Sequence, residues 1–181
     1  MSQNKDKFRT ELFEWVKSIL LAVVIAILIK TFLINTTYVI GSSMYPTLHE
    51  KDRLFTNKIV YKVEEPERED IVVINAPDVP DKDYIKRIIA LEGDIVEIKD
   101  GRVYLNGKIL NEEYLKEDVY TYGELKLKVP KGHVFVLGDN RNRMASKDSR
   151  VFGPVKIDSI KGKAWIRWFP FDRRFGSLYS E

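Results

Sequence analysis

The β structure of this chain is clearest in residues 83–110, which read DYIKRIIALEGDIVEIKDGRVYLNGKIL. Three runs there, residues 84–91, 94–98 and 102–105, either alternate apolar and polar side chains or are rich in apolar and β-branched ones. Such alternation is typical of strands. The pairs Asp100-Gly101 and Asn106-Gly107 follow two of these runs, and both pairs favour two-residue hairpin turns. The stretch therefore predicts consecutive antiparallel strands.

Comparable runs lie on both sides of this stretch. They are residues 37–40, 54–61, 71–75, 125–129, 133–137 and 162–169. No segment after residue 35 keeps a helical repeat over three turns, and no internal repeat or interdomain linker interrupts it. Many short strands separated by turns are typical of closed or sandwiched antiparallel sheets. We therefore expect residues 35–181 to form one mainly β domain, an antiparallel barrel or sandwich.

The N-terminal region carries a different pattern. An unbroken apolar run covers residues 19–29, and apolar character resumes after Lys30 and Thr31. A cleavable signal peptide would have a basic leader and an apolar run of this size, but no small-x-small cleavage site follows. The whole segment, residues 15–34, is long enough to cross a bilayer, with Lys17 and Lys30 near its ends. We expect a retained transmembrane helix over residues 15–34.

The distribution of basic residues orients this anchor. Lys5, Lys7, Arg9 and Lys17 precede the apolar run, whereas few basic residues follow it closely. Positive charge on the N-terminal side predicts a cytoplasmic tail at residues 1–14 and an extracytoplasmic β domain at residues 35–181. The expected location is the cytoplasmic membrane of the cell, crossed once.

Composition excludes several classes of function. The chain has 181 residues, no cysteine and a formal net charge of +3. Without cysteine there are no disulfides, thiolate metal sites or cysteine proteases. The near-neutral charge argues against nucleic acid as a partner.

One serine lies close to the predicted anchor. Ser43 stands in GSSMYPTL, residues 41–48, and an extended chain advances at most about 3.6 Å per residue, which places it within roughly 30 Å of the bilayer edge. A serine among Gly, Ser and Pro is usually a turn residue. If it is a nucleophile instead, its substrate is presented at the membrane surface.

A lysine in an apolar strand could activate that serine. In a strand, Lys86 shares a face with Tyr84 and Ile88, and Arg87 shares the other face with apolar residues. One of the two basic residues is therefore expected to be buried, unless both lie at an edge and extend into solvent. Burial lowers a lysine pKa, and a neutral amine within reach of Ser43 could act as its general base. His49 and His133 are expected to be structural.

Two polar segments follow near residue 140. They read GDNR at residues 138–141 and SKDSR at residues 146–150. Such a loop is often only held together by Asp–Arg pairs. Alternatively, Ser146 orients the lysine amine, while Asp148 and Arg150 brace the loop.

At these positions the chain resembles the bacterial type I signal peptidases. The family's nucleophile box resembles residues 41–48, and its lysine box resembles residues 84–87 followed by Gly93-Asp94. Its C-terminal box resembles the two polar segments, and a fourth box resembles REDIV at residues 68–72. All four occur in the family's order. The compact spacing is similar to that of the single-anchor members.

The resemblance implies a set of site residues. Ser43 would be the nucleophile, Lys86 the general base and Ser146 a hydrogen-bond partner of the lysine amine, with the backbone N–H of Ser43 in the oxyanion hole. Asp139, Asp148 and Arg150 would support the site. The substrate would lie as an extended strand beside Ile40, Gly41, Ser42, Met44, Asp83, Tyr84 and Ile85. Small substrate residues would be preferred at positions −1 and −3, and no metal or organic cofactor is implied.

Three positions depart from the family pattern. Glu69 stands where the family usually has glycine, and Gly41 stands where some relatives have a hydroxyl residue. The segment Asn142–Ala145 is two residues longer than is common.

The sequence thus predicts a membrane-anchored serine endopeptidase that removes signal peptides from exported preproteins. Its expected partners are preproteins and the lipid bilayer, with no nucleic acid, and we expect a monomer. Two other functions fit parts of the pattern. A self-cleaving Ser/Lys protease like the DNA-damage repressors would need a soluble DNA-binding domain in place of the anchor. A non-catalytic anchored β module would not depend on the Ser43 hydroxyl.

Overall fold

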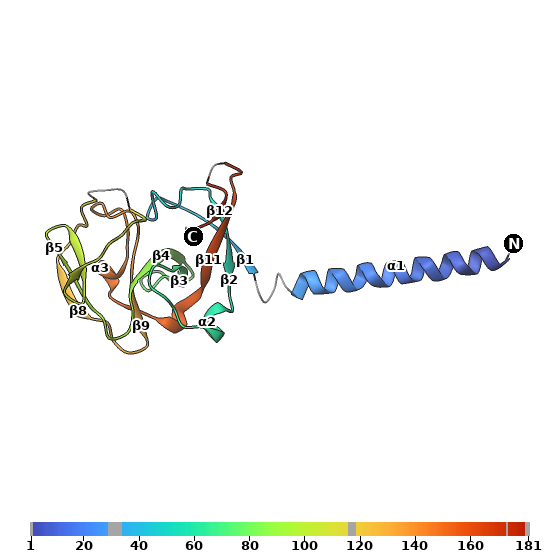
Figure 1. The fold of residues 1–181 in the computed structure, drawn as a ribbon, viewed down its shortest axis with the longest axis horizontal. Coiled ribbons are helices and arrows are strands. Elements are labelled where there is room, and N and C mark those ends of the chain that lie inside the picture. Colours follow the sequence, from blue (N-terminus) through green and yellow to red (C-terminus); the bar gives the residue numbers. More distant parts are fainter. Residues whose placement is uncertain (1, 29–33, 116–118, 173, 180–181) are drawn as a thin grey trace.

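The computed structural model describes residues 2–28, 34–115, 119–172 and 174–179. A long N-terminal helix precedes a β domain (Figure 1). The helices are α1 (Ser2–Leu28), α2 (Val60–Val63), α3 (Ser149–Phe152) and the 3₁₀ turn η2 (Ile157–Ser159). The strands are β1 (Ile34–Tyr38), β2 (Arg53–Asn57), β3 (Ile71–Asn75), β4 (Asp83–Ala90), β5 (Ile95–Lys99), β6 (Arg102–Leu105), β7 (Lys108–Ile109), β8 (Leu125–Lys128), β9 (His133–Leu137), β10 (Val155–Lys156), β11 (Ile160–Phe169) and β12 (Gly176–Ser177).

The strands form two sheets. The larger has the order β1-β2-β11-β3-β4-β9-β10, with β12 beside β11, and the smaller has the order β7-β6-β5-β8. Neighbouring described strands are antiparallel. The prediction of a mainly antiparallel β fold is therefore confirmed. A closed barrel is wrong for the described strands, because β1 and β10 end the larger sheet without pairing to each other.

Both predicted hairpin turns are formed. Asp100 and Gly101 have φ of 52° and 73°, and Asn106 and Gly107 have φ of 51° and 82°. Lys99 pairs with Arg102, and Leu105 pairs with Lys108. Two central residues with positive φ are what a tight antiparallel turn requires. These turns set the register of the smaller sheet.

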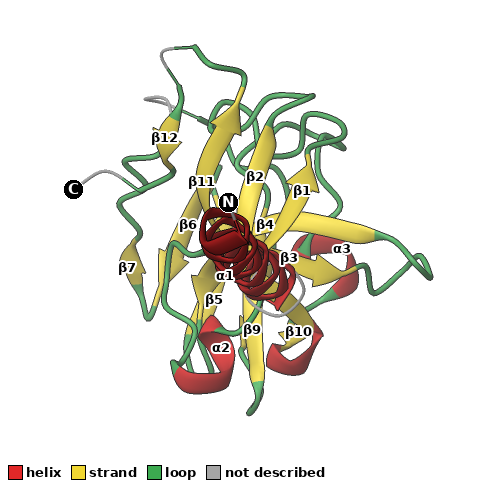
Figure 2. Cartoon of the chain, turned by 90° about the vertical axis from the view of Figure 1, so that its right-hand side faces the viewer, coloured by secondary structure: helices red, strands yellow, loops and turns green. Residues whose placement is uncertain are grey.

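One buried cluster joins the sheets. It contains Ile89 and Ala90 of β4 and Phe135 and Leu137 of β9 from the larger sheet. The smaller sheet contributes Val96, Ile98 and Val103. Figure 2 shows the strands of this domain from the side on which α1 projects. Burial of these apolar side chains is the main force that holds the two sheets together.

The strand predicted at residues 54–61 extends past the C-terminal end of the strand in the structure. Strand β2 stops at Asn57, and α2 begins at Val60. The side-chain oxygen Oδ1 of Asn57 accepts a hydrogen bond of 3.0 Å from the backbone N–H of Ile59. A local side-chain turn of this kind competes with the strand ladder, so the chain bends where the hydropathy pattern continues.

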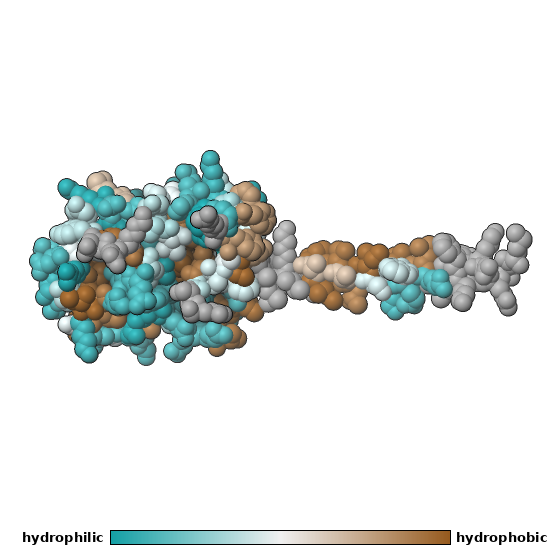
Figure 3. All heavy atoms as spheres, turned by 45° about the horizontal axis from the view of Figure 1, so that its top comes forward, coloured by the Kyte–Doolittle hydropathy of each residue, from teal (hydrophilic) through white to brown (hydrophobic). Residues whose placement is uncertain are grey.

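Helix α1 extends from Ser2 to Leu28. Figure 3 shows hydrophobic residues over the part of α1 nearest the β domain. Of the helices in the described ranges, none combines the length and the apolar character needed to cross a membrane. The predicted anchor at residues 15–34 falls partly on residues 29–33, which lie outside the described residues. Its last residue, Ile34, begins β1.

Candidate active site

Ser43 lies in a turn that follows β1. Gly41 has φ of 81°, which allows the chain to reverse direction, and Tyr45 donates its backbone N–H to the Ser42 carbonyl at 3.1 Å. Met44 and Leu48 are buried in an apolar cluster beneath this turn. The side chain of Ser43 is half-buried. Its neighbours therefore anchor the turn, while Ser43 stays accessible.

Lys86 reaches this serine from β4. Its side chain is 2% exposed, and its Nζ lies 2.9 Å from Ser43 Oγ and 2.8 Å from the Ile85 carbonyl oxygen. Burial lowers the pKa of Lys86 to about 8, although Asp148 and Asp139 act in the opposite direction. A substantial fraction of this amine is therefore neutral near physiological pH. In its neutral state, Nζ can accept a hydrogen bond from the Ser43 hydroxyl at this distance.

Arg87 is buried as well, with 3% exposure. It donates from Nε and Nη2 to the two carboxylate oxygens of Asp139, at 3.0 and 2.7 Å. Its guanidinium also lies 3.8 Å from the centre of the Tyr114 ring. The sequence predicted one buried basic residue in this strand, but both are buried. The charge of Arg87 is compensated by Asp139, whereas Lys86 has no direct ion pair among the described residues.

The segment after β9 holds the Ser43 turn in place. The backbone N–H of Asn140 donates to the Ser43 carbonyl, and its Nδ2 donates to the Ser42 carbonyl, both at 3.0 Å. Asp139 also accepts a hydrogen bond of 2.5 Å from Thr47 Oγ1. No role for Asn140, Thr47 or Arg87 was predicted from the sequence. Their presence within the quoted boxes was the only signal for them.

Asp148 and Arg150 brace the loop behind the site. Asp148 is fully buried and accepts from the Gly138 backbone N–H at 3.1 Å. Arg150 donates to both of its oxygens, at 2.8 and 2.7 Å. Burial raises the pKa of Asp148, but these hydrogen bonds and the Arg150 charge outweigh it and lower the pKa overall. Asp148 therefore carries a fixed negative charge near Lys86.

Ser146 is buried close to the Ser43 carbonyl, but it does not make the expected contact. Its Oγ makes no contact with hydrogen-bond geometry in the described part of the chain, although it lies near enough to Asp148 to help lower the pKa of that carboxyl. The predicted hydrogen bond to Lys86 is absent here. A side chain at Gly138 would collide with both Ser146 Oγ and the Ser43 carbonyl. Gly138 therefore allows these two groups to approach. Ser149 points elsewhere and accepts from the Val136 backbone N–H at 2.9 Å.

Two of the departures from the family pattern, the longer segment Asn142–Ala145 and the residue Glu69, have structural consequences. The longer segment Asn142–Ala145 forms an exposed turn, in which Ala145 donates to the Asn142 carbonyl at 3.2 Å. Ser146 is thereby kept in the site. Glu69 adopts φ of 72°, a conformation that suits glycine, and its carbonyl accepts from Arg87 Nη1 at 2.9 Å.

A cleft of about 110 Å³ opens beside Ser43 and Lys86. Its lining includes six of the predicted site residues other than Lys86, namely Ile40, Ser43, Met44, Asp83, Tyr84 and Ile85. Gly41 and Ser42 do not line it. Among the described strands, β1 pairs only with β2, and β4 pairs with β9 only from Arg87 onward. Two unpaired backbone edges therefore border the cleft, and an extended peptide can hydrogen-bond to such edges.

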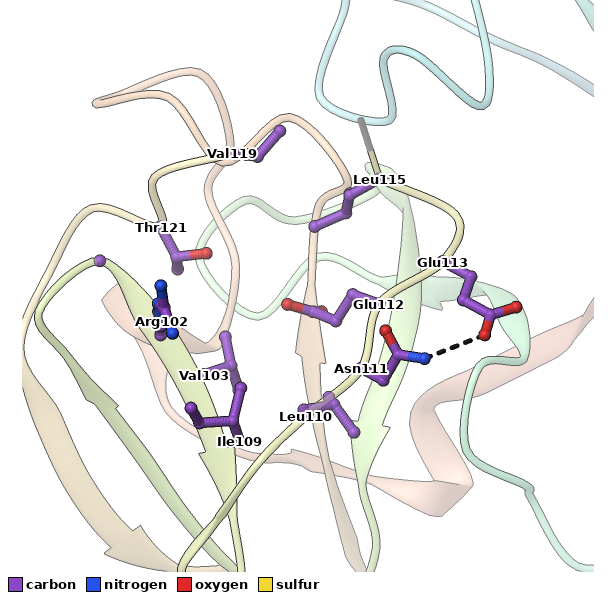
Figure 4. Close-up of a pocket in the computed structure, with 11 residues that line it drawn as sticks. Arg102, Val103, Ile109, Leu110, Asn111, Glu112, Glu113, Leu115, Val119 and Thr121 are labelled. Carbon is purple, nitrogen blue, oxygen red and sulfur yellow. Dashed lines mark hydrogen bonds between the residues drawn. The ribbon is translucent and has the colours of Figure 1, made fainter. Parts of the chain in front are cut away.

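A cavity of about 470 Å³ lies elsewhere, between strands of the smaller sheet and the loop that follows them (Figure 4). Its lining includes Arg102, Val103, Leu110, Glu112 and Thr121, and none of the residues around Ser43. Glu112 forms an ion pair with buried Arg141. Within the ranges that the structure describes, no group of three or more His, Asp or Glu side chains is arranged to hold a metal ion. His133 Nδ1 lies 2.8 Å from the Lys131 carbonyl.

Comparison with known proteins gives consistent matches. The family described as "Signal peptidase, peptidase S26" matches residues 12–169. A signal peptidase I of Bacillus licheniformis is 44% identical over 91% of this chain and 92% of its own length. Signal peptidase I T of Bacillus subtilis is 43% identical over 93% of this chain and 90% of its own. A crystal structure of a signal peptidase I from Enterococcus faecalis, 35% identical, covers 56% of this chain and 97% of its own, with a TM-score of 0.48.

Proposed function

The chain belongs to the signal peptidase family, peptidase S26, as an enzyme of the signal peptidase I type, and from this premise we propose that it cleaves signal peptides with Ser43 as nucleophile and Lys86 as general base. The observation that carries the proposal is the 2.9 Å contact between the buried Lys86 amine and the Ser43 hydroxyl. No other lysine or histidine of the described residues is hydrogen-bonded to Ser43. A Ser/Lys pair therefore fits this site better than a histidine-based triad.

The proposed reaction begins with neutral Lys86. Ser43 Oγ attacks the carbonyl carbon of the scissile bond while its proton passes to Lys86 Nζ. The backbone N–H of Ser43 donates to the oxyanion that develops. The ammonium then gives its proton to the departing amine, which leaves an ester on Ser43. Lys86, neutral again, then takes a proton from a water molecule that attacks the ester carbonyl carbon. It returns this proton to Ser43 Oγ as the carboxylic acid product leaves.

Ser146 is proposed to orient the lysine during this cycle. Its hydroxyl is buried near the Ser43 carbonyl and has no partner in the described structure. A buried hydroxyl without a partner is unfavourable, so the ammonium formed after proton transfer offers it a suitable donor. Asp139, Asp148 and Arg150 support this arrangement through the contacts described above.

The substrate is proposed to bind as a strand between β1 and β4. The two unpaired edges supply main-chain hydrogen bonds, and the small cleft volume favours small residues at positions −1 and −3. Ile40, Gly41, Ser42 and Met44 would border one side of this strand, and Asp83, Tyr84 and Ile85 the other. The proposed partners are exported preproteins.

We propose that the N-terminal segment holds the enzyme at the cytoplasmic membrane. Large apolar side chains of α1, including Leu20, Leu21 and Ile27, are about half exposed or more. Exposed apolar surface of this extent favours an apolar environment, and the sequence of residues 15–34 has the length of a bilayer-spanning segment. Residues 1–14 would be cytoplasmic, and residues 35–181 would act outside as a single-pass, monomeric enzyme.

One experiment tests the catalytic assignment. Purified protein is incubated with a preprotein, and the new N-terminus of the product is mapped. We expect one cleavage after the signal peptide, its complete loss in Ser43→Ala and normal cleavage in the control Ser159→Ala, which alters a half-buried serine of η2 whose Oγ donates to the Lys156 carbonyl. Processing by Ser43→Ala above a few per cent of the original rate would refute the nucleophile.

A further inference from the structure

Tyr84 lies beside the Lys86 amine on one face of β4. Residues two apart in a strand share a face, and Lys86 Nζ lies over the Tyr84 ring, 5.2 Å from its centre. Tyr84 also lines the cleft beside Ser43. The face of an aromatic ring carries partial negative charge, so it attracts a cation at this distance. The ring therefore favours the charged form of Lys86 over the neutral one.

The neighbours of Tyr84 hold its ring in this position. The ring stacks on that of Phe152 in α3, with centres 6.4 Å apart and planes inclined by 18°. Asp78, which forms an ion pair with Lys147 at 3.0 Å, lies close to the Tyr84 hydroxyl. Burial and this carboxylate raise the pKa of Tyr84, so the ring stays neutral where Lys86 titrates. The ring face thus keeps a fixed place and a fixed charge distribution.

The other groups that act on the Lys86 amine do so differently. Its hydrogen bonds go to two neutral oxygen atoms. In the segment after β9, Asp148 and Asp139 raise the pKa of Lys86 through space and Arg150 lowers it, and burial outweighs the two carboxylates. A carboxylate in direct contact would raise the pKa further and leave less of the amine neutral. The ring attracts the ammonium without adding a charge, so it stabilises the protonated form at a smaller cost to the resting base.

We propose that Tyr84 is a positioning residue of the reaction, whose ring face attracts the ammonium formed on Lys86 as Nζ takes the Ser43 proton. The inference rests on the proposed function, in which Lys86 is the general base. Starting from the neutral amine, positive charge develops on Nζ during proton transfer, so the attraction is stronger in the transition state than in the resting base. An interaction of this kind accelerates the chemical step.

The first test changes the charge on the ring face and keeps its shape. Tyr84→Phe is compared with a variant that has a trifluorinated phenylalanine at this position, in which fluorine withdraws electron density from the ring face. The pKa of Lys86 is measured in the full chain by NMR of isotopically labelled lysine side chains, with Lys86→Met to assign the signal. We expect Tyr84→Phe to leave this pKa nearly unchanged, because both rings attract cations. The fluorinated ring should lower it by about 0.5–1, equivalent to about 0.7–1.4 kcal/mol.

The second test removes the ring and follows the reaction. In Tyr84→Leu, the acidic limb of the kcat/KM profile for peptide cleavage should move to lower pH, and kcat above this limb should fall by about threefold to tenfold. If Tyr84 served only to exclude water, the smaller leucine would admit water and the pKa of Lys86 would rise instead. The matched control is Tyr104→Leu, which removes the ring that lies 4.9 Å from Lys99 Nζ on the smaller sheet. It should leave the profile and the pKa of Lys86 unchanged.

The outcomes separate two failures. An unchanged or higher pKa of Lys86 beside the fluorinated ring would overturn the inference, and so would a lower pKa with unchanged kcat, while cleavage itself would leave the proposed function intact. If Tyr84→Leu does not fold, the phenylalanine and its fluorinated form decide the question by the same two measurements. Absence of cleavage of every peptide by the original enzyme would refute the proposed function and with it the part of Tyr84 in the reaction. The NMR titration would still show whether the ring stabilises the ammonium.

Discussion

The chemistry of the site depends on one residue whose environment differs from that of its neighbour. Lys86 and Arg87 are both buried, but only Arg87 has a carboxylate bound directly to it. The lysine therefore bears the cost of desolvation, which lowers its pKa to about 8. The same burial that weakens the fold makes the amine a useful base.

Lys86→Arg should be nearly inactive, because a guanidinium stays protonated and cannot accept the Ser43 proton. In the original enzyme, kcat/KM should rise with pH through about 8 and then level off, as the amine loses its proton. The pH profile of peptide cleavage and the rate of the variant measure both effects. Activity of Lys86→Arg within tenfold of the original would contradict the assignment.

Lys86→Met should be more stable than the original protein at pH 7. The pKa of Lys86 is about 8 in the folded state against an ordinary value of 10.5, so below pH 8 the charged, buried amine costs about 3 kcal/mol. Between pH 8 and 10.5 the unfolded state binds more protons, so the stability of the original protein rises with pH. Denaturant unfolding at pH 7 and pH 10 should show the advantage of Lys86→Met shrinking. An equal advantage at both pH values would rule out this cause.

Ser146→Ala should separate catalysis from stability. Loss of the hydroxyl should lower kcat by about one to two orders of magnitude, since a hydrogen bond to a charged group contributes about 1.5–3 kcal/mol. KM should hardly change, and the unfolding midpoint should stay the same or rise slightly, because the buried hydroxyl has no partner in the resting structure. Ser149→Ala should do the reverse, with lower stability from the lost Val136 contact and a smaller change in kcat. A silent Ser146→Ala would remove Ser146 from the mechanism.

At the residue scale, the sequence predicted that Lys86 lies within reach of Ser43, because each occupies a specific motif, and the structure places the two groups in contact. The sequence could not identify Asn140 as the residue that fixes the Ser42 and Ser43 carbonyls. That role depends on where two distant loops come together, and no local pattern reports it. It also placed Ser146 on the lysine amine, a contact that the structure does not contain.

At the scale of elements, the sequence predicts the hairpin turns but not the order in which distant strands pair. The Asp-Gly and Asn-Gly pairs predicted both hairpins, because a turn is decided by its own two residues. The insertion of β11 between β2 and β3 joins strands far apart in sequence, so no periodicity reveals it. The end of β2 at Asn57 was missed because a side-chain hydrogen bond, rather than hydropathy, ends the strand.

Glu69→Gly should stabilise the turn before β3. Glu69 has φ of 72° and an exposed side chain, and a residue with a Cβ in this conformation costs about 1 kcal/mol. We expect the free energy of unfolding to rise by about 0.5–1 kcal/mol in denaturant titrations. The control Glu67→Gly, where φ is not positive, should lower it. If Glu69→Gly is less stable than the original protein, the Glu69 side chain makes a contact that stabilises the fold by more than its positive φ costs.

At the scale of the whole molecule, we expect the N-terminal segment and the β domain to have separable roles. Removal of residues 1–33 leaves β1 intact, because its first residue is Ile34. The remaining domain should cut short peptides with kcat/KM within about twofold of the full chain. Cleavage of membrane-inserted preprotein should fall by at least about tenfold, because the proposed anchor would raise the effective concentration of enzyme at the substrate. Equal turnover of inserted preprotein by both forms would exclude a tethering role.

The unpaired edges of β1 and β4 have a consequence for the breadth of substrates. In the proposed binding mode, hydrogen bonds along these edges would engage the peptide main chain, which is the same in every preprotein. Affinity gained in this way does not depend on the identity of most side chains. We therefore expect one enzyme to cleave many preproteins of unrelated sequence. Its selectivity should come from steric exclusion of side chains too large for the cleft.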